Sequence, residues 1–423
     1  MVLFLARIKK DNFTLNMPAI PLFDLSRQNQ NTELTASIKA AVDRVLEHQQ
    51  FILGKEVVAL EQEMEAACFD NKADAVGVSS GTDGLLAILM AKNISAGDAV
   101  ITTPYTFFAT ASCVHRVGAE IVFCDIDPKT FMMDPEKLRV LLASLKCEED
   151  GALRTAKGNR VKMIIPIHLF GTCCDMDAIM ALAQEYGLMV IEDAAQVIGA
   201  DYPSKEGTKK AGAIAEMSFV SFYPTKNLGA FGDAGLVACL DPKMAEQLRI
   251  VRNHGMEERY YHKVVGGNFR LDGIQAAVLR ARLPFLSQWN EQRQRNAAIY
   301  KEAFTKAGLL DRLALPAEPW AASGLKNHHI YHQYVIRILG DEAVAQREKI
   351  IAHFNKNQIG YAIYYPVPLH LQECFAYLEH KPGAYPESER AAEETLALPI
   401  FPELKPEEIQ AVVAAIAEAL KEN

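Results

Sequence analysis

The chain has 423 residues, half of them hydrophobic, and a formal net charge of −9. This length allows a large buried core and a second domain. The acidic balance argues against a nucleic-acid partner, because proteins that bind phosphate backbones carry an excess of Lys and Arg. No stretch approaches the roughly 20 apolar residues that cross a bilayer, and the opening MVLFLARIKK is too short and ends too basic for a secretory signal. We therefore expect a cytoplasmic protein with no membrane partner.

The eight cysteines are sparse for a chain of this length, and several lie inside apolar runs. This usage is typical of small buried hydrophobic residues in a reducing compartment. The adjacent Cys173 and Cys174 lack the CxxC spacing of a zinc site. We predict neither a disulfide framework nor a metal site.

The order of sequence patterns predicts two domains. Residues 1–16 carry no clear pattern and are interpreted as an N-terminal extension. Between residues 75 and 238, helical patterns alternate with short apolar runs, which are AVGVS, AVITT, EIVFCDI, MIIPI, LMVIED, MSFVSF and GLVAC. This alternation predicts an α/β fold with a mostly parallel sheet covered by helices on both faces. We assign residues 17–285 to this large domain and residues 286–423, which open with a long helical stretch, to a smaller α+β domain.

Lys226 follows the predicted strand MSFVSF, in SFYPTKNLGAFGDAG. Its amine should therefore lie near the rim of the sheet, where open α/β sheets bind ligands. An amine that forms a Schiff base needs a lowered pKa, which burial and a neighbouring charge can supply. Considered alone, such a lysine is more often a surface residue.

Asp193 ends the apolar strand LMVIED. A carboxylate in this place is suited to keep a pyridine nitrogen protonated, so that a pyridoxal ring can accept electrons. An Asp before AAQ is also a favourable helix N-cap, and both roles are compatible. Gln196 is placed to reach the phenolic oxygen of such a cofactor, although a lone Gln is more often an ordinary polar helix residue.

Two further segments suit the same ligand. In SSGTDGLLAILMA, the N–H groups of Gly81 and Thr82 would face an anion at the start of a helix, and the Ser221 hydroxyl could join them. A Gly-Thr-Asp turn is also a normal strand-to-helix connection. The segment TTPYTFFAT offers Tyr105, Phe107 and Phe108, of which one ring could stack on a pyridine face, although aromatic residues at this spacing are more often core.

Together and in this order, these segments resemble the DegT/DnrJ/EryC1/StrS family of sugar-nucleotide aminotransferases. Members of that family have the type I, aspartate aminotransferase-like fold and use pyridoxal 5'-phosphate. The resemblance runs from about residue 20 to the C-terminus. Its motifs are FILGKEVVALEQEM, SSGTDGL, TTPYTFFATA, PIHLFGTCCDMD, VIEDAAQVIGA, SFYPTKNLGAFGDAG, RNHG, GGNFRLDGIQAAVL, YHQYVIR, YYPVPLHLQ and LPIFPEL.

The resemblance implies a role for each candidate residue. It makes Lys226 the lysine of the Schiff base and Asp193 the partner of the pyridine nitrogen. Asn268 falls where the family sends a residue across a homodimer interface to the cofactor phosphate, so two shared active sites are implied. Arg270 is then a substrate contact, although GGNFR could simply be a turn before a helix. The other implied cofactor contacts are Gln196 to the phenolic oxygen, Phe107 stacked on the ring, and Gly81, Thr82 and Ser221 to the phosphate.

The implied reaction moves an amino group from an amino acid, in the family usually glutamate, to a nucleotide-linked keto-hexose. Small-domain segments YHQYVIR and YYPVPLHLQ are more similar to members that aminate C3 than C4. They add His332, Tyr365 and His370 as substrate contacts, each of which could equally be a satisfied polar core residue. Thr172 and Ile198 depart from the commonest family residues, Gln and His, and bear on the substrate.

Two rival functions remain open at this point. One is a sugar dehydration performed by family relatives in which a histidine replaces the lysine, and Lys226 argues against it. The other is a non-catalytic, cofactor-binding sensor. An attached DNA-binding domain would favour the sensor, and neither the acidic composition nor the length leaves room for one.

Overall fold

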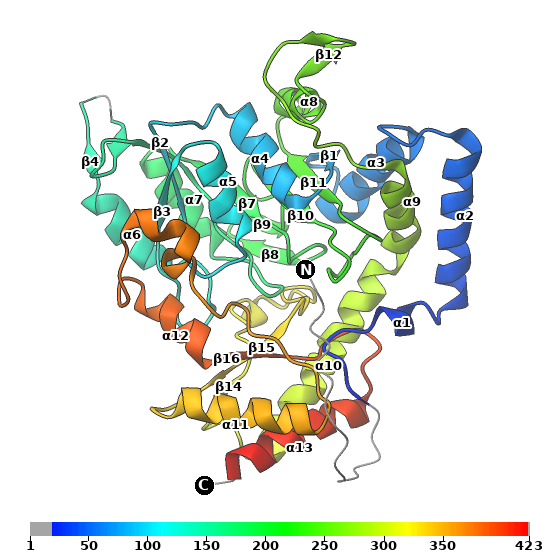
Figure 1. The fold of residues 1–423 in the computed structure, drawn as a ribbon, viewed down its shortest axis with the longest axis vertical. Coiled ribbons are helices and arrows are strands. Elements are labelled where there is room, and N and C mark those ends of the chain that lie inside the picture. The colour runs from blue at the N-terminus through cyan, green and yellow to red at the C-terminus, as the bar shows by residue number, and fades with distance from the viewer. Residues whose placement is uncertain (1–18, 150, 422–423) are drawn as a thin grey trace.

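The computed structural model describes residues 19–149 and 151–421. The extension predicted over residues 1–16 lies outside the described residues. The described chain forms a large lobe around a mixed sheet and a small lobe around a three-stranded sheet, which lies in the lower part of Figure 1. Most of the candidate site residues belong to the large lobe.

The central sheet is mostly parallel, as the sequence predicts. The strands of its main path are β1 (Asp74–Val78), β2 (Asp98–Thr102), β3 (Glu120–Phe123), β6 (Arg160–Ile164), β7 (Met189–Asp193), β10 (Met217–Ser221) and β11 (Gly235–Cys239). Their spatial order is β3-β2-β6-β7-β10-β11-β1. Neighbours from β3 to β10 are parallel, whereas β11 is antiparallel to both β10 and β1. Each of the predicted apolar runs overlaps one of these strands.

Separate sets of helices cover the two faces of this sheet. One set is α3 (Lys55–Phe69), α6 (Pro135–Ser144), α7 (Met176–Glu185) and α9 (Gly273–Arg282), and the other is α4 (Gly81–Ala91), α5 (Ala109–Arg116) and α8 (Pro242–Val251). Because side chains alternate along a strand, consecutive residues such as Val190 and Ile191 belong to different core clusters. Both faces are buried, which explains why the strands are almost continuously apolar.

Several smaller elements decorate the large lobe. Helix α2 packs against α9 through Ala41 and Val45, at the right of Figure 1, and the β12–β13 hairpin projects at the top. The polar segment 147–162 contributes a short hairpin, β4–β5, attached to β6. The bounds are α1 (Leu25–Gln28), α2 (Thr32–His48), β4 (Lys146–Cys147), β5 (Leu153–Arg154), β8 (Asp201–Ser204), β9 (Gly207–Lys210), β12 (Met256–Glu258) and β13 (Tyr261–His262).

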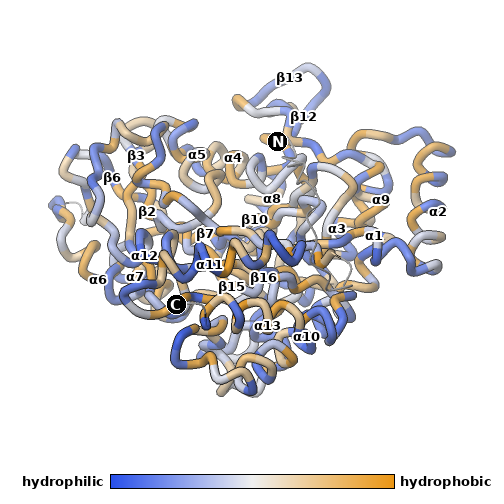
Figure 2. The backbone as a smooth tube through the Cα atoms, turned by 60° about the horizontal axis from the view of Figure 1, so that its bottom comes forward, coloured by the Kyte–Doolittle hydropathy of each residue, from blue (hydrophilic) through white to orange (hydrophobic). Residues whose placement is uncertain are grey.

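The small lobe is an antiparallel sheet backed by helices. Its strands are β14 (Leu313–Ala314), β15 (Tyr334–Ile338) and β16 (Thr395–Leu398), and its helices are α11 (Ala343–Lys356), α12 (Pro386–Glu394) and α13 (Pro406–Lys421). In Figure 2, α11 alternates between hydrophilic and hydrophobic stretches, as expected for a helix with one buried face. Ile20 also belongs to this core and donates its backbone N–H to the Gln358 carbonyl at 3.0 Å.

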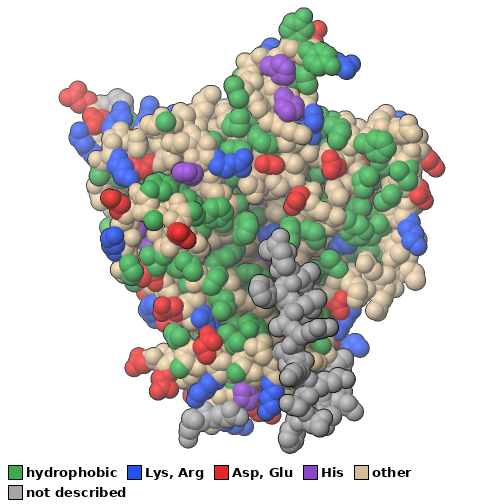
Figure 3. All heavy atoms as spheres, viewed as in Figure 1, with side chains coloured by type: hydrophobic (Ala, Val, Ile, Leu, Met, Phe, Trp, Pro, Cys, Tyr) green, Lys and Arg blue, Asp and Glu red, His purple; other side chains and the backbone are tan. Residues whose placement is uncertain are grey.

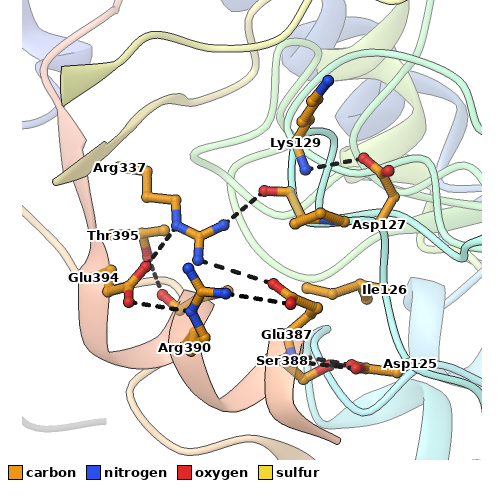
Figure 4. A network of polar contacts seen from close by, with 12 residues as sticks. Asp125, Ile126, Asp127, Lys129, Arg337, Glu387, Ser388, Arg390, Glu394 and Thr395 are labelled. Atoms are coloured by element: carbon orange, nitrogen blue, oxygen red, sulfur yellow. Dashed lines mark hydrogen bonds and ion pairs between the residues drawn. The ribbon is translucent and has the colours of Figure 1, made fainter. Parts of the chain in front are cut away.

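Two features hold the lobes together. Helix α10 (Leu286–Lys306) contributes Trp289 to the core of the large lobe and Tyr300 to that of the small lobe. Helix α12 provides the second connection, shown in Figure 4: Asp125, beyond the end of β3, accepts hydrogen bonds from the Ser388 backbone N–H at 3.0 Å and from its hydroxyl at 2.6 Å. The lobes are therefore fixed against each other by a shared helix and by polar contacts.

Within residues 19–149 and 151–421, no helix combines the length and apolar character that a bilayer crossing requires. The same residues contain no group of three or more His, Cys, Asp or Glu side chains that could hold a metal ion. Cys173 and Cys174 are both unpaired and fully buried. They pack in the core, as their sequence context predicts.

Candidate active site

The candidate residues lie where parallel strands end. β1 and β10 run in the same direction because each is antiparallel to β11, and β7 is parallel to β10. Asp193 is the last residue of β7, Lys226 lies five residues beyond the end of β10, and Gly81 lies three residues beyond the end of β1. The C-terminal edge of an open α/β sheet is its usual ligand site. The fold thus gathers residues that are far apart in the sequence.

Asp193 is a buried carboxylate held by two donors. Only 6% of the residue is exposed. Its Oδ2 accepts a hydrogen bond from Thr110 Oγ1 at 3.0 Å, and its Oδ1 accepts one from the Ala195 backbone N–H at 3.1 Å. Burial raises the pKa of Asp193, while these donors and the charge of Lys226 act in the opposite direction. Residues 194–199 form turns, so Asp193 does not cap a helix.

Lys226 lies in the turn that follows β10, close to Asp193. Its backbone N–H donates to the Tyr223 carbonyl at 2.8 Å, which fixes this turn. Burial lowers the pKa of Lys226 to about 8, and the charge of Asp193 opposes this shift. A neutral amine is the form that attacks a carbonyl carbon. With this pKa, an appreciable fraction of the Lys226 amine is neutral near physiological pH.

The side-chain amide of Gln196 is oriented by a contact at each end. Its Oε1 accepts a hydrogen bond from the Phe170 backbone N–H at 2.7 Å, and its Nε2 donates to the Tyr365 hydroxyl at 3.3 Å. Because a backbone N–H can only donate, the Phe170 contact assigns the two ends of the amide. Gln196 therefore presents N–H donors on the side where Tyr365 enters from the small lobe.

The three residues predicted for the phosphate lie together. Gly81 and Thr82 open helix α4. N–H groups in the first turn of a helix have no partner within the helix and favour an anion. Ser221 lies directly beside them, since a Cβ added to Gly81 would meet Ser221 Cβ at 3.0 Å. A glycine at this position thus brings the helix terminus against the end of β10.

Of the aromatic candidates, Phe107 and Tyr365 face each other at the site. Their ring centroids are 6.4 Å apart, and 59% of Phe107 is exposed. Phe108 instead stacks on Phe375 at 5.5 Å, and Tyr105 is buried. Phe107 therefore has free ring surface for a stacked ligand.

His332 reaches the same region from the small lobe. Its Nδ1 lies 3.1 Å from Oδ1 of Asn227, the residue after Lys226. Burial lowers the pKa of His332 well below its usual value, and the charge of Lys226 adds to this effect. His332 is therefore a neutral imidazole beside the lysine turn.

Asn268 and Arg270 line a separate outer cavity of about 360 Å³, together with Ser79 and Asp233. Asn268 is exposed. Arg270 Nη1 donates to Asn253 Oδ1 at 3.1 Å, while its buried Nε has no hydrogen-bond partner within the described part of the chain. Ser79 connects this cavity to the start of helix α4.

The structure does not bring His370 to the other candidate site residues. Its ring is buried against Tyr385 at 4.8 Å, and its Nε2 lies 3.0 Å from Glu389 Oε1 in helix α12. Burial lowers the pKa of His370. These contacts match the other interpretation of His370, that of a polar core residue, although only its Nε2 has a hydrogen-bond partner among the described residues.

Sequence reasoning missed three partners in the site. Thr110 lies inside the motif TTPYTFFATA, and Asn227 follows Lys226 directly, so both belong to motifs that carry the family resemblance. The backbone N–H of Phe170 carries no residue-type signal at all. The hydrogen bond from Thr110 to Asp193 becomes visible only when helix α5 is placed beside the end of β7.

The fold is that of the aspartate aminotransferase-like enzymes that use pyridoxal phosphate. The crystal structure of DesV from S. venezuelae, in complex with a ketimine intermediate, superposes on 96% of this chain and on all of DesV, with a TM-score of 0.83 and 34% identity. The predicted fold class is confirmed. The chain is a pyridoxal-phosphate-dependent aminotransferase.

The chain belongs to the DegT/DnrJ/EryC1/StrS aminotransferase family, whose model matches residues 32–417. A pleiotropic regulatory protein from Geobacillus stearothermophilus is 41% identical over 94% of this chain and 98% of its own. A UDP-N-acetyl-3-dehydro-alpha-D-glucosamine 3-aminotransferase from Acidithiobacillus ferrooxidans is 39% identical over 95% of this chain and 98% of its own. The resemblance inferred from the motifs is thus confirmed.

Proposed function

We propose that the chain transfers an amino group from an amino acid, with glutamate as the expected donor, to C3 of a nucleotide-linked 3-keto hexose. The observation that carries the proposal is the Lys226 amine, whose pKa burial lowers, beside the buried Asp193 carboxylate, at the edge where the helix α4 terminus offers an anion site. The name of the Acidithiobacillus ferrooxidans relative supports C3. Amination at C4 is the alternative.

The residues present fit pyridoxal phosphate. The glycine at position 81 lets the start of α4 lie against Ser221, so that helix N–H groups and the hydroxyl are placed for one phosphate, and the exposed face of Phe107 suits a flat ring. Gln196 offers N–H donors for the phenolic oxygen. When bound, the cofactor supplies an electron-withdrawing ring that stabilises negative charge on a substrate carbon.

Asp193 would hold the proton of the ring nitrogen. Its two donors, Thr110 and Ala195, leave further lone pairs of the carboxylate free for a third. A cationic ring nitrogen would add an opposite charge and so favour the ionised carboxylate against the effect of burial. The hydrogen bond from Thr110 would keep the acceptor atom aimed at that nitrogen.

Lys226 would bind the cofactor covalently and would move the proton once the amino donor displaces it. In the neutral form it can take a proton from the α-carbon of the donor and deliver it to the neighbouring cofactor carbon. Its lowered pKa places this base close to working pH. The reverse sequence would place the amine on the sugar.

The substrate would lie between the two lobes. His332 and Tyr365 are the proposed sugar contacts, because both reach the site from the small lobe. His332 contacts Asn227 in the lysine turn, and Tyr365 contacts the Gln196 amide. Arg270 is the proposed contact to the diphosphate, since this cationic residue lines the outer cavity. Which keto carbon reacts then depends on how these groups orient the sugar.

We propose a homodimer with two shared active sites. Asn268 is exposed here and would reach the cofactor phosphate of the partner. The nearby hairpin β12–β13 carries Tyr260, Tyr261 and Val265, which are 74%, 68% and 85% exposed, and Figure 3 shows this hairpin at the top with hydrophobic and histidine side chains. A projecting apolar arm of this kind is typical of an interaction surface.

A regulatory role is the second candidate, because the relative from Geobacillus stearothermophilus bears the name of a regulatory protein. The complete site argues for catalysis in this chain. A sensor needs to bind the cofactor, but it has no need of the small-lobe residues His332 and Tyr365 beside the cofactor contacts. Lys226 likewise argues against a dehydratase, in which a histidine takes its place.

The unpaired cysteines fit a cytoplasmic location.

The function is tested by product analysis. The purified, cofactor-loaded enzyme is incubated with glutamate and a panel of nucleotide-linked 3-keto and 4-keto hexoses, and aminated products are identified by mass spectrometry and NMR. We expect a 3-amino sugar nucleotide and stoichiometric 2-oxoglutarate. Turnover of 4-keto sugars alone would overturn C3, and no amination of any sugar would favour the sensor.

A further inference from the structure

Tyr105 is a buried tyrosine whose hydroxyl joins the large lobe to the small one. It lies in the loop between β2 and α5, with 1% of its surface exposed. Its hydroxyl donates a hydrogen bond to the Tyr364 carbonyl and lies 3.0 Å from Thr395 Oγ1. Figure 4 shows Thr395 at the end of helix α12, beside Glu394. Burial raises the pKa of Tyr105, so the phenol keeps the proton that it donates.

The ring of Tyr105 is equally fixed. It lies edge-on to Tyr365, with centroids 5.9 Å apart and an interplanar angle of 75°, and it contacts Phe131 at 6.1 Å. Phe131 in turn contacts Phe170 at 6.2 Å, and the Phe170 backbone N–H holds Gln196. Since Gln196 donates to Tyr365, these residues form a closed circuit around the donor end of the Gln196 amide.

The small-lobe segment that carries Tyr365 has few other tethers. Ala362 pairs with Ala397 on one side, and the Leu369 backbone N–H donates to the Pro104 carbonyl at 2.7 Å on the other. Pro366 and Pro368 lie between them and have no N–H to donate. The hydroxyl of Tyr105 therefore holds this stretch near its middle.

We propose that Tyr105 is a positioning residue for the transamination: its hydroxyl anchors the Tyr364 peptide and thereby sets the Tyr365 hydroxyl against Gln196, beside the cofactor. This inference rests on the proposed function, because Tyr365 is a substrate contact only if the chain aminates a sugar. Tyr105 touches neither Gln196 nor Lys226 in any described contact and acts through Tyr365. A purely structural role would instead lower stability without altering the Tyr365 contact.

The test compares two tyrosine-to-phenylalanine variants in the cofactor-loaded enzyme. Tyr105→Phe keeps the ring and removes the anchoring hydroxyl. Tyr300→Phe is the matched control, because Tyr300 is fully buried in the small-lobe core and its hydroxyl has no partner within residues 19–149 and 151–421. For Tyr105→Phe we expect kcat/KM for the sugar nucleotide to fall about fivefold, as for one lost hydrogen bond. The half-reaction with glutamate and the control should each change less than about twofold.

A double-mutant cycle tests whether Tyr105 acts through Tyr365. If it does, Tyr105→Phe should cause no further loss in an enzyme that already carries Tyr365→Phe. Losses that multiply in the double variant would overturn the proposal. So would a Tyr105→Phe enzyme that matches the Tyr300→Phe control with both substrates.

Hydrogen exchange supplies a readout that is independent of activity. Amides of residues 361–368 should exchange faster in Tyr105→Phe than in wild type or Tyr300→Phe, with or without cofactor. Unchanged exchange would overturn the anchoring role. If the wild type aminates no sugar at all, the proposed function fails, whereas a faster exchange of this segment would still establish the anchor itself.

Discussion

The inner and outer halves of the candidate site differ in how completely one chain builds them. In the inner half, both ends of the Gln196 amide and both carboxylate oxygens of Asp193 have described partners from the same chain. In the outer cavity, Asn268 is exposed and Arg270 keeps a buried Nε with no partner in the described chain. The side chains of the inner half are therefore already held in place by this chain. Those of the outer half still lack partners, which a ligand or a second subunit could supply.

The difference follows from which elements carry each half. Asp193 and the Lys226 turn end strands at the centre of the sheet, where pairing on both sides fixes their positions. Asn268 and Arg270 belong to the segment between the projecting hairpin and helix α9, which lies at the border of the lobe. Sites on paired strands are more precise than sites on connecting segments. A cofactor needs that precision, and a second subunit or a substrate can complete the rest.

The largest effect is expected from removing the amine at the centre of the inner half. Lys226→Ala should lower transaminase activity by a factor on the order of 10³ or more, because base and covalent attachment are lost together. Circular dichroism should be unchanged, and the visible absorbance of the cofactor-linked enzyme should disappear. Lys301→Ala, at an exposed position, is the control. Full activity in Lys226→Ala would refute the assignment of the lysine.

Asp193→Asn tests the second member of the inner half. The amide keeps the shape of the carboxylate but cannot hold a ring nitrogen proton, so kcat should fall by about 10² or more. Steady-state kinetics of both half-reactions measures this loss, with Asp43→Asn at an exposed position as the control. If Asp193→Asn is as active as wild type, the negative charge of Asp193 is not needed for the reaction.

The lowered pKa of Lys226 predicts how the rate of cofactor attachment depends on pH. The neutral amine attacks the cofactor aldehyde, and the amine loses its proton as pH rises through about 8. The rate of cofactor attachment to the apoenzyme should therefore rise about tenfold per pH unit below this value and level off above it. Stopped-flow absorbance measures the profile. An inflection near the ordinary lysine pKa would show that burial does not tune this amine.

Thr110→Val tests whether the partners of Asp193 matter. The change removes the hydroxyl that donates to Asp193 Oδ2 but nearly preserves volume, and one lost hydrogen bond should lower kcat about three- to tenfold. Thr305→Val on the exposed face of helix α10 is the matched control and should leave kcat unchanged. Equal kinetics in both variants would make the Thr110 contact dispensable.

Mixed dimers test whether a second subunit completes the site, and they give the smallest signal. Subunits with Lys226→Ala and subunits with Asn268→Ala are refolded together in equal amounts. About half of the dimers then contain one subunit of each kind. Each of these mixed dimers has one intact site out of two, so activity should return to about a quarter of wild type. Size-exclusion chromatography verifies the dimers. Activity no higher than that of either parent would contradict sharing of the site.

The central sheet could be read from the sequence because its strands are buried on both faces. Such strands are continuous apolar runs between helical patterns, and each predicted run overlaps a strand of the main path. The β4–β5 hairpin, largely within the polar segment 147–162, could not be read in the same way, because two-residue strands are too short to show a period. Ile20 pairs with the distant Gln358, a contact that leaves no local signal.

The candidate site likewise combines residues that the sequence reveals with contacts that leave no local signal in it. Asp193 and Lys226 could be selected because the ends of apolar strands are visible in the sequence and the motifs around them are specific. The hydrogen bond from Thr110 depends on the placement of helix α5, and the donor at Phe170 depends on the loop after β6. His370 stood in the same motif as Tyr365, yet the chain turns it into the core beside helix α12. Sequence spacing cannot reveal which side of an irregular segment faces a cavity.

Helix α10 has a consequence for how the molecule unfolds. At 1.5 Å per residue its 21 residues extend about 31 Å, with Leu286 and Trp289 in the core of the large lobe and Tyr300 and Phe304 in that of the small lobe. Melting the small lobe would withdraw these anchoring side chains from the large lobe as well. The two lobes should therefore lose their structure in one cooperative urea transition, followed identically by tryptophan fluorescence and circular dichroism.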